Sequence, residues 1–200
     1  MMKNISFIVD KVLDEKEFEE YKNYLQNVAV YRMVEGDNNK KFYITDMPYG
    51  LQESIVKTLE KIHHCEINVV LSTIRKATQY LDKNWAIHSD LSVGVDKIPD
   101  YGAVFYISQN DQDLSGTALW RHKELGYSMP RDIPQKEMLE ISNKDYNNIE
   151  KWELSSVIGG IENRLTAYPA EYFHSKFPKQ AWGATQKDCR LVAAIFYQLT

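Results

Sequence analysis

The sequence contains only two cysteines in 200 residues, Cys65 and Cys189, and it has no C-x-x-C pair. This scarcity argues against a zinc knuckle and a disulfide framework, so both thiols are expected to be reduced. No apolar run approaches the length of a membrane-spanning helix. The chain also reaches Asp10 before any apolar run of signal-peptide length, and we therefore expect a cytoplasmic protein.

Long runs of one charge are missing as well. Lysine and arginine total 24 against 28 aspartate and glutamate residues, which gives a formal net charge of -4. Without a basic stripe the chain has no general attraction to a phosphate backbone or to an anionic membrane. Nucleic-acid and membrane partners are therefore disfavoured. The hydrophobic share of 44% is ordinary for a compact globular domain.

Helical patterns dominate the first third of the chain. Asp14 and Glu17 have the spacing of a capping box, and apolar residues recur at helical spacing from there to about Val28. Pro48 opens a second helix, whose apolar stripe runs to the histidines at 63 and 64. We expect residues 1–66 to form a helical layer that packs on the rest of the domain.

From Ile67 onward the pattern changes to short runs rich in β-branched and aromatic residues, separated by turn residues. The predicted strands are 68–75, 85–88, 102–108, 116–122, 152–158, 163–168, 171–174 and 190–198. Together they indicate a mainly β protein with flanking helices, in which residues 67–200 form a double-stranded β-helix (jelly roll, cupin-like) core. A single domain is expected overall. Residues 123–151 are too long for a plain turn and are interpreted as a functional lid or a mobile insertion.

An H-x-D triplet, His88-Ser89-Asp90, carries the clearest chemical signal in the chain. In an extended strand alternate side chains share a face, so residues 88 and 90 can both approach one metal ion. His174 can then complete a 2-His-1-carboxylate face. Such a face leaves three positions of an octahedral ion open, which suits an iron(II) oxygenase that binds an organic acid and dioxygen. Arg190 offers a planar fork for a carboxylate of that acid.

The triplet alone occurs by chance in many chains, and the joint pattern is more specific. At about residues 70–198 the chain resembles the iron(II)- and 2-oxoglutarate-dependent dioxygenases, particularly their prolyl-hydroxylase-like branch. Residues 105–108 (FYIS) are similar to the branch's aromatic-Tyr-Leu-Asn strand, and residues 115–119 (SGTAL) are similar to its Gly-Gly-x-Thr-x-Phe segment. Ser115 replaces one glycine, and the interval from His174 to Arg190 is longer than in animal-type prolyl hydroxylases.

The resemblance implies roles for individual residues. His88, Asp90 and His174 would bind Fe(II), Arg190 would bind the distal carboxylate of the cosubstrate 2-oxoglutarate, and Tyr106 would bond to the same carboxylate. With O2, such an enzyme hydroxylates an unactivated C–H bond of an amino-acid-like small molecule or a peptidyl residue and releases succinate and CO2. Related halogenases have a small residue at the position of Asp90, so hydroxylation is favoured over halogenation.

Four further residues are candidates for substrate contact. Trp85 precedes the triplet, together with Arg75, and both could shape the mouth of a pocket. Trp120 and His122 share one face of a predicted strand; if that face lines the barrel, His122 is a pocket residue, and otherwise it lies at the rim. Trp182 is either a lid or a plug at the end of the barrel.

Other residues have simpler interpretations. His63 and His64 are adjacent on a helix, where side chains diverge, so a metal site there is not expected. Arg164 is predicted to form a structural ion pair, and Cys189 to be a small core residue. Two other functions stay open. One is a metal-binding cupin without oxygenase activity, a binding or isomerase scaffold that has no need of Arg190, and the other is a non-catalytic domain that keeps the fold.

Overall fold

The computed structural model describes residues 5–36, 40–92, 97–110 and 114–200. Its strands are β1 (Phe7–Asp10), β2 (Arg32–Gly36), β3 (Lys40–Thr45), β4 (Ile67–Ala77), β5 (Tyr101–Tyr106), β6 (Gly116–His122), β7 (Trp152–Gly159), β8 (Arg164–Pro169), β9 (His174–Phe177) and β10 (Arg190–Leu199). Its helices are α1 (Glu15–Asn27), α2 (Tyr49–His63), α3 (Gln135–Asp145) and the short 3-10 turns η2 (Asp90–Ser92) and η3 (Ile149–Lys151).

Two antiparallel sheets form the body of the molecule. The larger has the order β1-β8-β5-β10-β4-β3-β2, and the smaller has the order β7-β6-β9. From β4 to β10 the chain passes repeatedly between the sheets, so strands far apart in sequence become neighbours. This is the jelly-roll arrangement expected from the strand pattern.

The N-terminal 66 residues contribute more than the expected helical layer. Both predicted helices are present, as α1 and α2, but β1, β2 and β3 also come from this part of the chain and lie at the two edges of the large sheet. Phe7 and Val9 alternate with more exposed residues along β1, which is the pattern of a half-buried strand. The sequence-based division at residue 66 therefore cuts through the large sheet.

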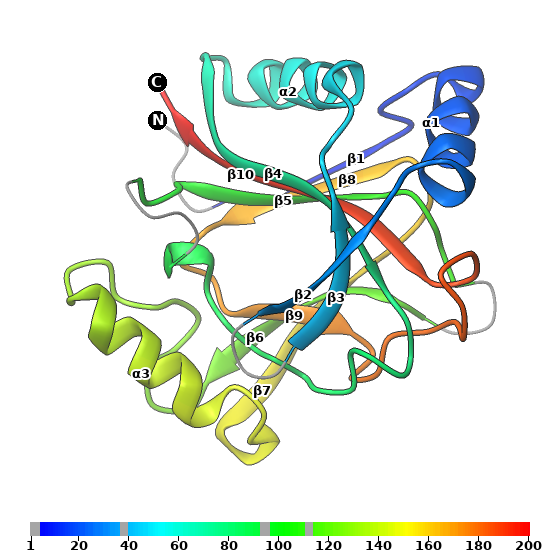
Figure 1. Cartoon of the computed structure of the whole chain (residues 1–200). Helices are drawn as coiled ribbons and strands as arrows, with labels where there is room; N and C mark the ends of the chain where they lie inside the picture. Colours follow the sequence, from blue (N-terminus) through cyan, green and yellow to red (C-terminus); the bar gives the residue numbers. More distant parts are fainter. Residues whose placement is uncertain (1–4, 37–39, 93–96, 111–113) are drawn as a thin grey trace.

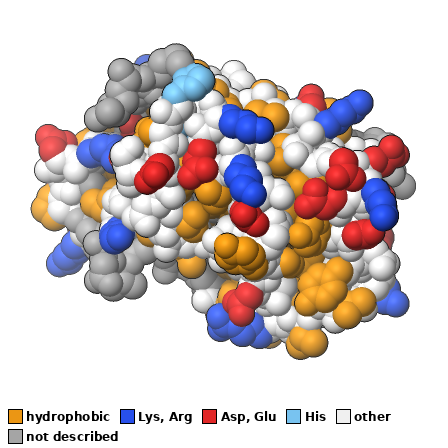
Figure 2. Space-filling model, turned by 90° about the horizontal axis from the view of Figure 1, so that it is seen from above, with side chains coloured by type: hydrophobic (Ala, Val, Ile, Leu, Met, Phe, Trp, Pro, Cys, Tyr) orange, Lys and Arg blue, Asp and Glu red, His pale blue; other side chains and the backbone are white. Residues whose placement is uncertain are grey.

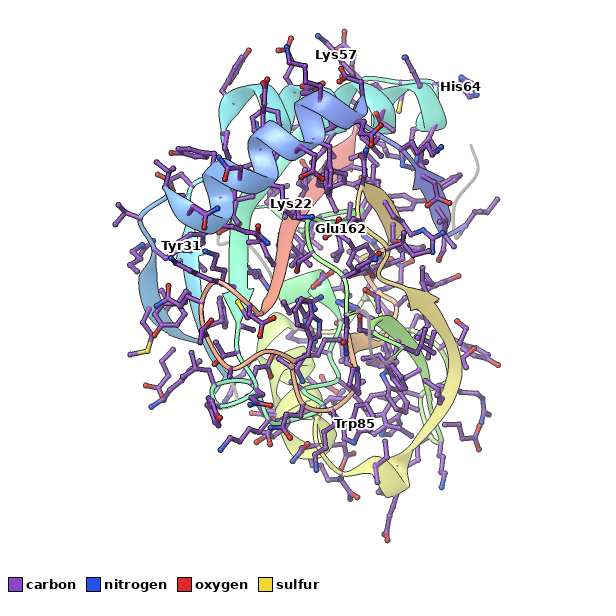
Figure 3. The ribbon with its side chains drawn as sticks, turned by 90° about the vertical axis from the view of Figure 1, so that its right-hand side faces the viewer. Lys22, Tyr31, Lys57, His64, Trp85 and Glu162 are labelled. Atoms are coloured by element: carbon purple, nitrogen blue, oxygen red, sulfur yellow. The ribbon has the colours of Figure 1, made fainter. Side chains whose placement is uncertain are left out.

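Helices α1 and α2 cover the outer face of the large sheet (Figure 1). The Asp14 side chain accepts a hydrogen bond from the Glu17 N–H at 2.9 Å, which caps α1 as predicted. Apolar side chains of both helices, such as Phe18 and Ile55, pack into one cluster with the outward-facing residues of β10. In Figure 3, Lys22 of α1 points toward Glu162, and their 2.8 Å ion pair ties the helix to the turn before β8.

The outer face of the small sheet is covered by the segment 123–151. This segment contains α3, which flanks the small sheet in Figure 1. Ile141 of α3 and Leu125 pack against a second apolar cluster that includes Trp120 and Trp152. The segment is thus a packed layer of the molecule, and both sheets have a hydrophobic core on their outer side.

The space between the two sheets has a different character. Along β10, Leu191 and Ile195 face the helices, while Arg190, Val192 and Ala194 face the interior and line a cavity. The cavity is also lined by charged side chains, among them Arg75, Asp82 and Lys176. Charged groups are expensive to bury, so their presence between the sheets indicates a functional site.

The face that carries α1 and α2 shows acidic and basic side chains interspersed with apolar ones (Figure 2). It therefore presents no extended patch of a single charge. Among the described helices, none combines the length and the apolar character needed to cross a membrane.

Candidate metal centre

The predicted strand at 85–88 is not a regular strand. Only His88 pairs, in an isolated antiparallel bridge in which its N–H and C=O bond to the backbone of His174 at 3.0 and 2.9 Å. Ala86 is in the left-handed conformation, with φ of 50°, which costs a non-glycine residue roughly 1 kcal/mol. The N–H of Ile87 bonds to Tyr146, and that of Asp90 bonds to Ala170. Backbone bonds to three separate segments therefore hold the H-x-D triplet in place.

Three side chains converge at this point: His88 beside the small sheet, His174 at the start of β9, and Asp90 at the start of η2. The Nε2 atom of His88 lies 3.6 Å from Asp90 Oδ1, and the Nε2 atom of His174 lies 3.4 Å from Asp90 Oδ2. All the potential ligand atoms lie within 4.8 Å of one another, and no other such group of three is found in the described part of the chain. The structure thus brings together the three residues that the sequence singled out.

The hydrogen bonds of the two imidazoles fix which nitrogen faces the centre. His88 Nδ1 lies 2.8 Å from the Ala86 carbonyl, and His174 Nδ1 lies 2.9 Å from the Tyr172 carbonyl. Because a carbonyl only accepts, each Nδ1 carries the proton, and in the neutral ring Nε2 presents a lone pair. Outer hydrogen bonds of this kind orient metal-bound histidines.

The donor set fits a divalent cation. Asp90 is 1% exposed, and its Oδ2 atom has no hydrogen-bond donor among the described residues. Two imidazole lone pairs and a carboxylate that face one another repel unless a cation lies between them. Ligand bonds of about 2.1 Å would bring cis ligand atoms to roughly 3 Å from one another, somewhat closer than the 3.4 and 3.6 Å between the imidazoles and the carboxylate here. Two nitrogens and one oxygen on one side match the face used by non-heme iron(II).

Gly102 and Tyr168 support the carboxylate and one imidazole. A Cβ atom at Gly102 of β5 would lie 2.3 Å from Asp90 Oδ2, so only glycine leaves room for the carboxylate. The ring of Tyr168 on β8 packs at 4.5 Å, between centroids, from the ring of His174. Burial raises the pKa of the Tyr168 hydroxyl well above its usual value, and the nearby Asp90 carboxylate acts in the same direction. Tyr168 therefore stays neutral beside the metal group.

Replacing Gly102 with alanine is expected to weaken metal binding by about 10- to 100-fold, the range typical of a disturbed outer shell. The added methyl group displaces Asp90, which is short and fully enclosed. Calorimetric titration with Fe(II) under anaerobic conditions measures the change. Gly159→Ala is the matched control, because its Cβ would find its nearest neighbour at 3.7 Å; equal affinities for the two variants would contradict the assigned contact.

The triad opens onto the cavity between the sheets. Arg190 lines this cavity from the head of β10, as the sequence-based hypothesis requires of a carboxylate-binding residue. Tyr106 lies outside the lining. Its hydroxyl is 2.6 Å from Thr117 Oγ1, and Thr117 itself lines the cavity. The predicted contact of Tyr106 with the cosubstrate would thus pass through Thr117.

Of the four candidate substrate residues, only Trp85 lines the cavity. In Figure 3 it lies in the half of the molecule away from α1 and α2. Trp120 and His122 point to the opposite side of β6, into the apolar cluster beneath α3. His122 is 2% exposed; its Nε2 lies 3.3 Å from Asp145 Oδ2, and its Nδ1 accepts backbone N–H groups of residues 124 and 125. The cavity face of β6 is that of Thr117, and the contacts of His122 are structural.

Trp182 is half-buried, outside the residues that line the cavity. Its loop is fixed near the cavity by bonds from Gln79 N–H to the Gly183 carbonyl and from Ala181 N–H to the Asp82 carbonyl. Asp82 belongs to the lining.

The other interpretations agree with the structure. Arg164 forms a bidentate ion pair with Asp10, at 2.5 and 2.9 Å, as predicted. Cys189 is buried, and burial raises the pKa of its thiol to about 11. His63 bonds through Nε2 to the Tyr197 hydroxyl at 2.9 Å, which gives it a structural role.

Three residues that line the cavity had little or no place in the predictions made from the sequence. Arg75 of β4 was noted only as a possible pocket-mouth residue, and Tyr168 and Lys176 were not singled out. Lys176 lies 3.1 Å from Asp82 in a largely buried ion pair, and burial lowers the pKa of its ammonium group. Alternation along β4 and β8 could have placed Arg75 and Tyr168 on an interior face, but it does not say which face encloses the cavity.

Comparisons with known proteins bear on this geometry. No family model and no curated protein matches the chain. Solved structures do match across nearly its whole length. One is the non-heme α-ketoglutarate-dependent carbocyclase SnoK from nogalamycin biosynthesis, with a TM-score of 0.64 at 11% identity over 98% of this chain and 79% of SnoK. The chain has the fold of 2-oxoglutarate-dependent non-heme iron enzymes.

Two further structures share this fold. The epimerase SnoN, in complex with Fe3+, α-ketoglutarate and nogalamycin RO, has a TM-score of 0.65 at 12% identity over 98% of this chain and 79% of SnoN. HygX from Streptomyces hygroscopicus, with nickel, 2-oxoglutarate and hygromycin B bound, has a TM-score of 0.54 at 13% identity over 99% of this chain and 83% of HygX. The reactions named for these proteins include carbocyclisation and epimerisation, so the fold alone does not specify hydroxylation.

Proposed function

We propose that this chain is an Fe(II)- and 2-oxoglutarate-dependent dioxygenase that hydroxylates an unactivated C–H bond of an amino-acid-like small molecule or a peptidyl residue. The observation that carries the proposal is the convergence of His88, Asp90 and His174 on a cavity that also contains Arg190. Structures with this fold bind iron or nickel together with 2-oxoglutarate. Placement within the prolyl-hydroxylase-like branch rests on the sequence motifs alone and is part of the proposal.

Each residue has a defined task in this function. His88, Asp90 and His174 would hold Fe(II) on one side and leave three positions for the oxo acid and dioxygen. When bound together, iron and 2-oxoglutarate would use O2 to supply a strong oxidant, with one oxygen atom going into the succinate that forms as CO2 is lost and the other available for the substrate. Arg190 would pair with the distal carboxylate and so fix the direction in which the oxo acid enters the cavity. Val192 and Ala194 provide apolar walls that help to exclude water.

The Asp90 carboxylate also bears on the outcome of the reaction. It is enclosed, and Gly102 leaves just enough space for it. With this ligand in place the protein provides no position for a halide, as a small residue would. Transfer of an oxygen atom to the substrate is therefore favoured over halogenation.

The proposal is tested by mixing the protein anaerobically with Fe(II) and 2-oxoglutarate. A visible charge-transfer band is expected, because the oxo acid chelates the metal held by the triad. Admission of O2 in a screen of free amino acids, peptides and nucleosides should then give succinate and a product heavier by one oxygen atom. Protein that binds both ligands and shows no band would exclude this function and favour a metal-binding cupin without oxygenase activity. A product without added oxygen would exclude hydroxylation.

A further inference from the structure

Arg75, near the end of β4, is a partly buried cation that the proposed mechanism does not use. Its guanidinium carbon lies 5.3 Å from the centroid of the Phe42 ring and 5.6 Å from that of the Phe196 ring. The Nε atom is fully enclosed, and no hydrogen bond or ion pair to Arg75 is present among the described residues. The two rings restrict where the guanidinium can lie. The Nε donor is therefore unsatisfied, and the terminal N–H groups of the guanidinium have no acceptor among the described residues.

Arg75 lines the same cavity as Arg190 but lies at a different depth. On the paired strands Arg75 faces Val192, two residues along β10 from Arg190, which corresponds to roughly 7 Å. Further along β10, Phe196 pairs with Gly102, which adjoins the Asp90 carboxylate. Since the Arg75 guanidinium contacts the Phe196 ring, it lies nearer than the Arg190 backbone to the metal group.

The charges around Arg75 influence its pKa in opposite directions. Burial lowers the pKa of the Arg75 guanidinium; the Asp90 carboxylate acts to raise it, and Arg190 acts to lower it further. Arginine nevertheless remains charged in proteins. Two like charges thus face one cavity, and Asp90, which partly compensates them, is assigned to the metal.

A count of the charges in the cavity shows that the cosubstrate alone does not neutralise the site. Among the described residues that line it, Lys176 and Asp82 neutralise each other, which leaves Arg75, Arg190 and Asp90. A divalent ion raises the net charge to three positive. The dianion 2-oxoglutarate then leaves one positive charge in a site sheltered from water, where an unpaired charge is costly. One more negative charge is needed.

On the basis of the proposed function, we infer that Arg75 binds a carboxylate of the substrate, so that the substrate is a small organic acid with one net negative charge. A guanidinium and a carboxylate match as a planar, bidentate pair. A monocarboxylate supplies the one charge that is lacking, whereas a phosphate ester would bring about two. A residue within a peptide chain has no free α-carboxylate, so this site selects against peptidyl substrates.

The first experiment needs neither metal nor cosubstrate. Binding of propionate, with propionamide as the neutral control, is measured by saturation-transfer NMR in Arg190→Met protein, where Arg75 is the remaining free guanidinium among those described in the cavity. Propionate should bind and propionamide should not. Adding Arg75→Met should weaken propionate binding by roughly tenfold or more, as expected for a lost charged hydrogen-bonded pair. Equal propionate binding with and without Arg75 would overturn the inference.

The second experiment separates the substrate acid from the cosubstrate. In the anaerobic charge-transfer titration, Arg75→Met alone should keep the Kd for 2-oxoglutarate within about threefold, because Arg190 is intact. A loss as large as that of Arg190→Met would place Arg75 in the cosubstrate site and contradict the inference. If the Arg75→Met variant does not fold, both experiments are repeated with Arg75→Gln, which keeps the polarity of the side chain without its charge. If the wild-type protein gives no charge-transfer band, the oxygenase function is excluded. The propionate-binding experiment would still decide whether Arg75 binds a carboxylate.

Discussion

Replacing His174 with alanine is expected to abolish succinate formation. His174 supplies one of only three protein ligands, and its loss leaves His88 and Asp90 to hold the ion alone. Removal of an outer hydrogen-bonding partner already weakens metal sites by about 10- to 100-fold, so loss of a direct ligand should exceed about 100-fold in Fe(II) affinity. Anaerobic Fe(II) titration and a succinate assay with O2 measure the two effects.

The matched control is His64→Asn. His64 is exposed just after α2, far from Trp85 in Figure 3, and it is not among the residues that line the cavity. It adopts a left-handed conformation with φ of 56°, which asparagine tolerates better than alanine. This variant should bind Fe(II) and form succinate as the wild type does. Succinate formation by His174→Ala at the wild-type rate would mean that the third ligand is a different residue.

Local pattern was sufficient to locate most elements of this fold. Asp14 caps α1 where the capping box predicted it, and the predicted strand 116–122 coincides with β6. Both signals depend on residues within a few positions of one another. The triad also followed from local spacing plus one distant histidine, because a jelly roll brings β9 beside residue 88. Roles for single residues could thus be proposed before their positions were known.

Prediction from the sequence was wrong where the role of a residue depends on which segment covers its face of the sheet. On β6 both Thr117 and Trp120 are buried, at 2% and 3% exposed, because one side faces the cavity and α3 covers the other. Alternation alone cannot distinguish two buried faces, and Trp120 and His122 were therefore proposed as pocket residues. The left-handed Ala86 has no sequence signal either, since alanine has no preference for that conformation.

Replacing Arg190 with methionine is expected to weaken 2-oxoglutarate binding by orders of magnitude while Fe(II) affinity is kept. Arg190 lines the cavity from the head of β10, and methionine keeps an unbranched, flexible side chain there but removes the charge. Loss of one partner from a buried, charged pair costs roughly 2–5 kcal/mol. At 1.4 kcal/mol for each tenfold change, the Kd rises by about thirty-fold to several thousand-fold. The anaerobic charge-transfer titration gives both affinities.

Two further variants distinguish a specific carboxylate site from a general effect of charge. Arg190→Lys keeps the cation without the planar fork, so its affinity should lie between those of the wild type and Arg190→Met. Arg121→Met makes the same substitution in the exposed ion pair with Glu153 and should leave the titration unchanged. If Arg190→Met binds 2-oxoglutarate as the wild type does, the distal carboxylate lies elsewhere. A metal-binding cupin, which does not use Arg190, would then explain the triad better than an oxygenase.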